Sequence, residues 1–399
     1  MIFGFLFLIC LVGQVGIYLS GLRKVSVPVV VGEIAAGIVI GATGFGLLPP
    51  KDPLLANGLS ILSTIGFSML MFMVGTHLPL RDPGLRKALG KSSISVALCF
   101  VFAVPMAYLL AYLTGIHQIP VFTLLLANSS AAVVMPIVHE KKLDGPTVLL
   151  TTTWVAIADT ITIVALPLAL APNRLVNALA GTATVTVLAV VSFYGLKRFR
   201  ESKIGDYFRT RSKANGQALD FRHSLTILFG LSYVAYLFGV SFLVSGFAAG
   251  AIVALIGEPK RFSKQLIGAA EGFFVPLFFV LLGAQLDFRA LIHSTANLEL
   301  AGLIAAGTML VHVLVAKLVK LPVASGLAAA AQLGLPAAVV SLGLTAGTLT
   351  TVQGAAIVAG SIISLAICSV GCQLLQRYSV ASPDSPQTPP LEAHPGHDE

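Results

Sequence analysis

Residues 147–170 have the sequence TVLLTTTWVAIADTITIVALPLAL, which is long enough to cross a bilayer and holds one charged side chain, Asp159, near its middle. A charge at that depth costs at least about 2.5 kcal/mol, so such residues usually pair, bind an ion or carry a proton. The alternative is a structural carboxyl group that hydrogen-bonds to nearby threonines and joins two helices. The sequence favours an ion or proton site at Asp159.

The composition indicates a polytopic helical membrane protein. Of the 399 residues, 56% are hydrophobic and only 11% are charged. We predict an all-α protein with about 13 transmembrane helices, each about 20 residues long. The four cysteines lie in apolar spans without metal-ligand spacing. We therefore expect no cofactor, and no metal beyond a transported monovalent cation.

The basic residues are distributed unevenly between the predicted loops. The formal net charge of +8 could suggest a nucleic-acid partner, but 21 of the 25 Lys and Arg residues fall in loops on one side of the membrane. This bias follows the positive-inside rule and places the N-terminus outside and the C-terminus inside. We expect no nucleic-acid partner. The expected lack of a targeting peptide and the small size suit a bacterial inner membrane.

Two motifs recur about 210 residues apart in the chain. GEIAAGIVI at residues 32–40 returns as GFAAGAIVA at residues 246–254, and LMFMVGTHLPLR at 70–81 returns as FFVLLGAQLDFR at 278–289. In the predicted topology the two copies face opposite sides of the membrane. Inverted repeats of this kind are typical of secondary transporters, which place the substrate site near the midplane between the repeats.

The repeat divides the chain into four predicted parts. These are a first six-helix repeat at residues 1–170, a linker helix with a basic cytoplasmic loop at 171–222, a second, inverted six-helix repeat at 223–377 and a disordered cytoplasmic tail at 378–399. The tail is rich in Pro, Ser and acidic residues, a composition that cannot form a packed core.

Helix-breaking residues occupy corresponding places in the two predicted repeats. Asn128, Ser129 and Ser130 lie within one span, and about 200 residues later the chain has Gly334 and Pro336. Proline removes a backbone donor, glycine weakens a helix, and Asn and Ser side chains compete for backbone hydrogen bonds. Two ordinary kinks are the alternative. We predict two broken crossover helices beside the intramembrane carboxylate.

These segments resemble the monovalent cation/proton antiporter-2 family of sodium/proton and potassium/proton exchangers. The resemblance runs through nearly the whole chain in the family's order. The stretches VPVVVGEIAAGIVIGATGFGLLP, LMFMVGTHLPL and PLFFVLLGAQLDF resemble its second, third and tenth spans, and ANSSAAVVMPIVHEKKLDG followed by WVAIADTITIVALPL resembles its pair of site helices.

The resemblance implies a sodium/proton antiporter-like fold, a homodimer and particular residue roles. The aspartate that matches Asp159 binds cation and proton in turn, and hydroxyl groups that match Ser129 and Ser130 supply further oxygen ligands. A basic residue that matches Lys317 helps to hold the core together. With their polar neighbours, the predicted ion- and proton-binding residues are Asp159, Ser129, Ser130, Asn128 and Thr160.

The chain departs from the family's pattern at two places. Ala158 stands where Asp, Asn or Gln commonly precedes the site aspartate, so no second carboxylate lies there. Gly334, Leu335 and Pro336 stand where potassium-efflux relatives have Gly-Glu-Phe. With one carboxylate, the carrier crosses with either one proton or one monovalent cation. We therefore expect electroneutral one-for-one exchange.

The sequence predicts exchange of Na⁺ or K⁺ for H⁺ by alternating access, and not an enzyme. A low-dielectric cavity disfavours the charged carboxylate, so proton and cation compete for one site. The alternative is a sodium-coupled symporter of an organic anion on a similar fold. That function would need a larger polar cavity than the few intramembrane Asn and Gln residues suggest.

Overall fold

The computed structural model describes residues 2–20, 29–48, 52–76, 85–170, 175–238, 242–257, 265–266 and 268–379. Within these residues all regular structure is helical, which confirms the predicted all-α fold. A bilayer offers no partner for a free backbone N–H or C=O group, and a helix bonds these groups within itself. Residues 380–399, nearly all of the predicted tail, lie outside the described part of the chain.

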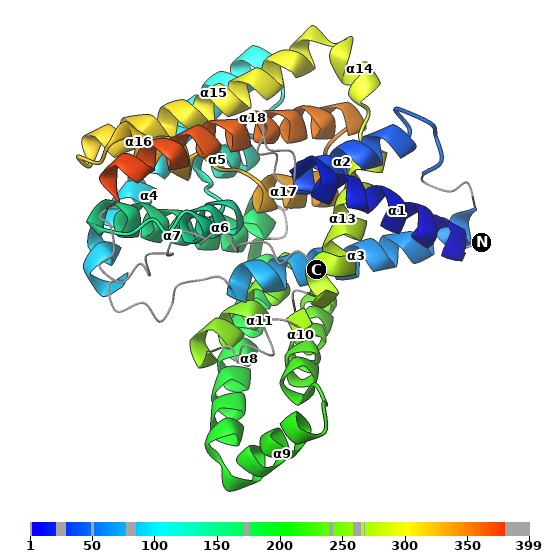
Figure 1. Cartoon of the computed structure of the whole chain (residues 1–399). Helices are drawn as coiled ribbons and strands as arrows, with labels where there is room; N and C mark the ends of the chain where they lie inside the picture. Colours follow the sequence, from blue (N-terminus) through cyan, green and yellow to red (C-terminus); the bar gives the residue numbers. More distant parts are fainter. Residues whose placement is uncertain are drawn as a thin grey trace, which may run out of the picture.

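The helices fall into a first group, a connector and a second group (Figure 1). The first group contains α1 (Ile2–Ser20), α2 (Val29–Ile40), α3 (Pro53–Thr76), α4 (Leu85–Thr114), α5 (Ile119–Ala127), α6 (Ala131–Glu140) and α7 (Pro146–Leu170). The connector contains α8 (Leu175–Glu201) and α9 (Lys203–Ala214). The second group contains α10 (Leu219–Leu237), α11 (Phe242–Ile256), the π-helix η2 (Ala270–Phe274), α13 (Val275–Gln285), α14 (Phe288–Ile292), α15 (Thr295–Leu318), α16 (Val323–Ala329), α17 (Gly334–Thr345), α18 (Thr351–Leu375) and the 3₁₀ helix η3 (Gln376–Tyr378).

Eight of the described helices are long and apolar enough to cross a membrane. Four further apolar stretches are shorter: Val29–Ile40, Ile119–Met135, Phe242–Ile256 and Ala270–Gln285. The stretch Ile119–Met135 is interrupted between α5 and α6, as predicted from its Asn and Ser residues. The total of about 13 spans stays a prediction.

The repeated motifs pack crosswise, each against the other motif of the opposite repeat. In the α2 motif, a side chain at Gly37 would collide with the backbone of Val280 in α13. In the α3 motif, a Cβ atom at Gly75 would lie 3.0 Å from the Cα atom of Gly250 in α11. The glycines are needed because these helix pairs approach backbone to backbone. The two halves are thereby joined by a pair of equivalent contacts.

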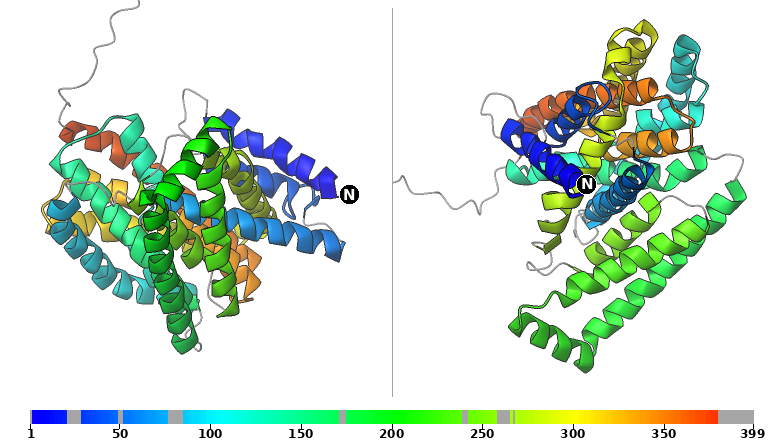
Figure 2. Two further views of the ribbon diagram at one scale, coloured as in Figure 1. Left: turned by 90° about the horizontal axis from the view of Figure 1, so that it is seen from below. Right: turned by 90° about the vertical axis from the view of Figure 1, so that its right-hand side faces the viewer.

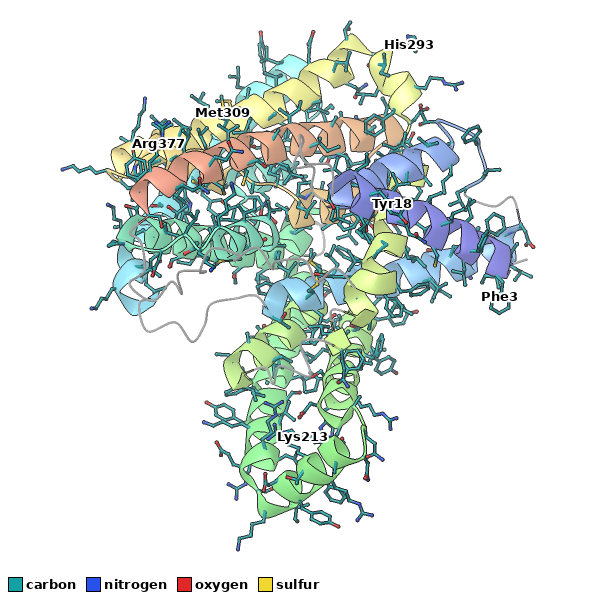
Figure 3. The ribbon with its side chains drawn as sticks, in the orientation of Figure 1. Phe3, Tyr18, Lys213, His293, Met309 and Arg377 are labelled. Carbon is teal, nitrogen blue, oxygen red and sulfur yellow. The ribbon has the colours of Figure 1, made fainter. Side chains whose placement is uncertain are left out.

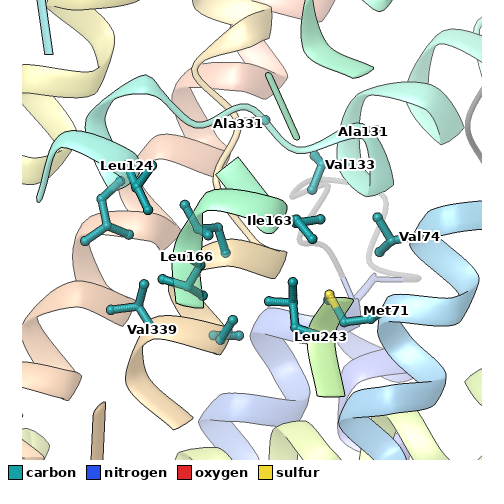
Figure 4. Close-up of a cluster of buried hydrophobic side chains, with 14 of the residues drawn as sticks. Met71, Val74, Leu124, Ala131, Val133, Ile163, Leu166, Leu243, Ala331 and Val339 are labelled. Carbon is teal, nitrogen blue, oxygen red and sulfur yellow. The ribbon is translucent and has the colours of Figure 1, made fainter. Parts of the chain in front are cut away.

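A buried hydrophobic cluster lies between the broken helices and the crosswise pairs. Figure 4 shows Met71 and Val74 of α3 and Leu243 of α11 on one side, with Ile163 and Leu166 of α7 between them and the crossovers. All of these side chains are buried. Ala131 and Ala331, one from each broken helix, lie along the same edge of this cluster (Figure 4). The core therefore fixes both breaks relative to α7.

An arm of two helices extends from the main body of the molecule. The helices α8 and α10 run side by side, and α9 crosses between them at the far end (Figures 1 and 2). Both arm helices also pack against α11. The arm is therefore anchored on the second repeat, while its tip lies well away from the crossovers.

Candidate functional site

Two helices are interrupted at corresponding places in the repeats. The first break, Asn128, Ser129 and Ser130, separates α5 from α6, and the second break, at residues 330–333, separates α16 from α17. Every residue of the first break is buried, as is Gln332 in the second. This confirms the two predicted broken crossover helices. Gly334 and Pro336 were predicted to lie in the second break, but they lie directly after it, in the first turn of α17. The backbone N–H groups of a first turn have no partner within the helix, so proline costs no hydrogen bond there.

Asp159 lies near the middle of α7 and faces the first break. Its side chain is 1% exposed, and its Oδ2 atom accepts a 2.9 Å hydrogen bond from the backbone N–H of Ala131, the first residue of α6. The N-terminus of a helix has unpaired N–H groups and a partial positive charge, so it stabilises a carboxylate there. Among the described residues, this is the only hydrogen bond to the carboxylate, and its Oδ1 atom makes none.

The first break is also tied to α7 close to Asp159. The hydroxyl of Thr162, one turn after Asp159, lies 2.8 Å from Asn128 Oδ1, which ties the break to α7. The amide nitrogen of Asn128 and the hydroxyl of Ser130 are buried and have no hydrogen-bond partner among the described residues. Unpaired buried polar atoms are costly and uncommon in native proteins. Those in this break therefore mark a candidate place for an ion or water.

Thr160 makes a different contact from the one expected. Its hydroxyl donates a 2.7 Å hydrogen bond to the carbonyl of Ala156 in its own helix, and its side chain is half-buried. Threonines in apolar helices commonly bond to the preceding turn in this way. By contrast, the hydroxyl of Thr153 on the same helix is buried and has no hydrogen-bond partner within the described part of the chain.

The two breaks are joined to each other and to α15 by a polar cluster, here called the clasp, of Ser129, Thr308, His312, Ala329 and Gln332. Ser129 Oγ lies 2.6 Å from the carbonyl of Ala329, the last residue of α16, and 3.2 Å from His312 Nε2. Gln332 Nε2 lies 2.7 Å from Thr308 Oγ1 and also donates to the carbonyl of Leu125 in α5. The first break thus bonds to α16, which precedes the second break, and the second break bonds to α5, which precedes the first.

His312 is the centre of the clasp. It is fully buried, its Nδ1 atom lies 2.8 Å from the carbonyl of Thr308, and its ring stacks on that of Trp154 in α7 with centroids 5.7 Å apart. A carbonyl can only accept a hydrogen bond, so Nδ1 carries a proton. In a neutral ring Nε2 then accepts from Ser129, whose single proton is shared between His312 and Ala329.

Lys317 is not part of this cluster. It lies in the last turn of α15 with an exposed side chain, five residues after His312. Five residues rotate the side chain by about 140° around a helix, so the two residues cannot face the same neighbours. The structure therefore puts His312, and not Lys317, beside the crossovers. Thr308 was not expected at the site, and its only signal is polarity within an apolar span.

Known proteins were compared with this chain. A family model described as "Sodium/hydrogen exchanger, transmembrane" matches residues 7–374. The chain belongs to the sodium/hydrogen exchanger family. This confirms the resemblance to cation/proton antiporters that the motifs predicted.

Individual members of the family support this result. The Na⁺/H⁺ antiporter of Enterococcus hirae is 26% identical over 318 residues, which cover 77% of this chain and 79% of that protein. YjbQ of Bacillus subtilis is 28% identical over 287 residues, covering 67% of this chain but only 45% of YjbQ. The sodium proton antiporter MjNhaP1 of Methanocaldococcus jannaschii has a similar structure, with a TM-score of 0.62 at 15% identity over 95% of this chain and 96% of that one. At that identity the match shows the fold alone.

Proposed function

We propose that this exchanger moves one monovalent cation, Na⁺ or K⁺, against one proton by alternating access, and that the two compete for Asp159. The observation that carries the proposal is the placement of the buried carboxylate of Asp159 against the N-terminus of α6, at the break of a membrane-embedded helix. The names of relatives such as the E. hirae Na⁺/H⁺ antiporter support cation/proton exchange.

The geometry at Asp159 suits a site that alternates between two occupants. The Ala131 N–H holds one carboxylate oxygen, Oδ2, and leaves Oδ1 for a proton or a cation. Ionised, the group attracts a cation; protonated, it does not. Because Ala158 supplies no second acid, each crossing carries one positive charge in either direction, and the cycle is electroneutral.

Further ligands are proposed from the first break. Ser130 is the strongest candidate because its buried hydroxyl has no other partner, and Asn128 contributes its Oδ1 atom. The hydroxyl of Ser129 is used in the clasp and that of Thr160 within its own helix, so either could bind a cation only through a remaining lone pair. We assign both a smaller share of the binding.

The wider setting is also part of the proposal. We place the protein in a bacterial inner membrane, with the N-terminus outside and the C-terminus inside, as the distribution of basic residues favours. We further propose that the protein is a homodimer. We also propose that the chain divides into the four parts predicted from its sequence, with boundaries at residues 170, 222 and 377. Large exposed apolar side chains on α1, such as Phe3 and Phe7, suit contact with lipid or a second copy.

Proteoliposomes test this function. A pH-sensitive dye is trapped inside, a pH gradient is imposed, and Na⁺, K⁺ or Li⁺ is added outside, with and without a clamped membrane potential. We expect cation-triggered proton movement that is independent of the potential and names the ion. Asp159→Asn should fall to the level of empty vesicles, whereas Asp206→Asn, an exposed carboxylate on α9, should match the unmodified protein.

The same vesicles separate the alternatives. Exchange that responds to the potential would replace the electroneutral scheme, and unaltered exchange in Asp159→Asn would move the site elsewhere. Cation-dependent uptake of an organic anion without proton movement would instead establish the symporter.

A further inference from the structure

The helix α9 forms the tip of the arm and contacts little of the rest of the protein. It packs against the ends of α8 and α10, and no role in exchange is assigned to it. Figure 3 shows side chains projecting outward from the far end of the arm, where α9 lies. Packing against the rest of the protein therefore does not account for the side chains on the outer side of α9.

The orientation of α9 is fixed by polar contacts on its inner side. Asp220 Oδ1, at the start of α10, lies 3.2 Å from Arg200 Nη2 and 3.3 Å from Arg209 Nε. Ser202 caps the helix by accepting a 3.0 Å hydrogen bond from the N–H of Gly205. Gly205 is buried, and a side chain there would collide with the carbonyl of Phe199. These contacts determine which face of α9 points outward.

The outward face is apolar in its middle. Ile204, Tyr207 and Phe208 are 66%, 56% and 50% exposed, and their spacing of three and four residues places them on one side of the helix. Two basic side chains, Lys203 and Arg211, are exposed on the same side of the helix and border this apolar stripe. Arg211 also donates a 2.8 Å hydrogen bond to the hydroxyl of Tyr207.

The charge of the surrounding residues and the adjoining helix α8 indicate what covers the apolar face of α9. Residues 197–222 contain eight Lys and Arg residues against three Asp and Glu residues. An apolar stripe bordered by basic residues is the pattern of a helix that lies at a bilayer surface and is attracted to anionic lipids. The adjoining α8 is apolar enough to cross a membrane and exposes Val187, Val191 and Tyr194 along its length. The bilayer that covers α8 therefore ends close to α9.

We propose that the outer face of α9 docks on the headgroup layer of anionic phospholipids, with Ile204, Tyr207 and Phe208 inserted and Lys203 and Arg211 bound to phosphate groups. A protein partner would need about 800 Å² of contact for a stable interface, far more than three side chains of a single short helix provide. The docked helix would hold the tip of the arm at a constant depth while the crossovers move.

Tryptophan fluorescence tests this docking in the full chain. The only native tryptophan, Trp154, is fully buried, so a reporter can be added by Tyr207→Trp or, as a second reporter, Phe208→Trp. Each variant is reconstituted in vesicles of brominated phosphatidylcholine alone or mixed with brominated phosphatidylglycerol. We expect quenching of the reporter to be at least about twofold stronger with the anionic lipid, since basic residues draw the helix to that surface.

Two controls make the outcome decisive. Lys203→Gln with Arg211→Gln should abolish the difference between the two lipids, and Tyr233→Trp, on the exposed side of α10, should be quenched equally in both. Equal quenching at α9 in both lipids, or a difference that survives the charge removal, overturns the proposal. Quenching that follows the ratio of protein to lipid, and not the lipid headgroup, would assign this face to a second copy of the chain.

Discussion

The two broken helices occupy corresponding places in the repeats but differ in chemistry. The first break, 128–130, is polar at every residue, whereas the second, 330–333, contains two alanines, Gln332 and a leucine. Both are buried at the same edge of the core, and both contribute to the clasp. The carboxylate of Asp159, however, bonds to Ala131, directly after the first break, and to no described residue of the second. The repeat therefore supplies a symmetric frame, and one half of it carries the proposed ion chemistry.

The largest effect that follows from this asymmetry is the dependence of the KM for the cation on pH. If the proton and the cation compete for one carboxylate, the KM for the cation should rise about tenfold for each unit of pH below the midpoint of Asp159, because one proton must leave for each cation that binds. Initial rates in proteoliposomes at several pH values and cation concentrations measure this slope. A slope near two would reveal a second proton, and a flat profile would contradict competition.

The second break should contribute stability more than chemistry. In Gln332→Leu the carbonyl of Leu125 and the hydroxyl of Thr308 lose their partner, which should lower the free energy of unfolding by about 1–3 kcal/mol. Thermal unfolding of the purified protein measures the loss. The matched control is Gln14→Leu, an exposed glutamine on α1, which should change the stability little. Equal stability of the two variants would mean that the clasp does not hold the breaks together.

The sequence predicted the two helix breaks better than the contacts that join them. Proline, glycine, Asn and Ser in apolar spans revealed both breaks, because each residue type weakens a helix by itself. The clasp depends on contacts between residues about 200 positions apart, such as Ser129 with Ala329, which no local pattern reveals. Lys317 was named from the family resemblance, but the helical period turns it away from His312 and the crossovers.

The crosswise glycine contacts show the same limit. The motifs repeated around Gly37 and Gly75 were visible in the chain, and their repetition predicted an inverted repeat. That each copy packs against the other motif of the opposite half follows only from the three-dimensional arrangement. Small residues predict a close approach between helices, but they do not say which helices approach.

A pair of single-atom changes compares the breaks directly. Ser130→Ala removes the unpaired hydroxyl next to the start of α6 and should raise the KM for the cation about tenfold, equivalent to about 1.4 kcal/mol of binding. Ala331→Ser adds a hydroxyl to the second break and should leave KM within about twofold, since no carboxylate bonds there. Concentration series at a fixed alkaline pH measure both values. Similar effects from the two changes would mean that both breaks bind the cation.

The smallest effect is expected at Thr160, although it is the nearest hydroxyl in the chain to Asp159. Thr160→Val keeps the shape of the side chain and removes a hydroxyl whose proton is already given to the carbonyl of Ala156. Because a backbone carbonyl inside a helix keeps its own N–H partner, the loss should change KM by less than about twofold and leave the stability unchanged within about 0.5 kcal/mol. Thr162→Val is the matched comparison, since that hydroxyl also contacts Asn128 and its loss should free the first break from α7. If Thr160→Val proves the more damaging of the two, the cation must bind on the side of α7 that faces away from Asn128, and the first break would then serve to position Asp159 and not to bind the ion.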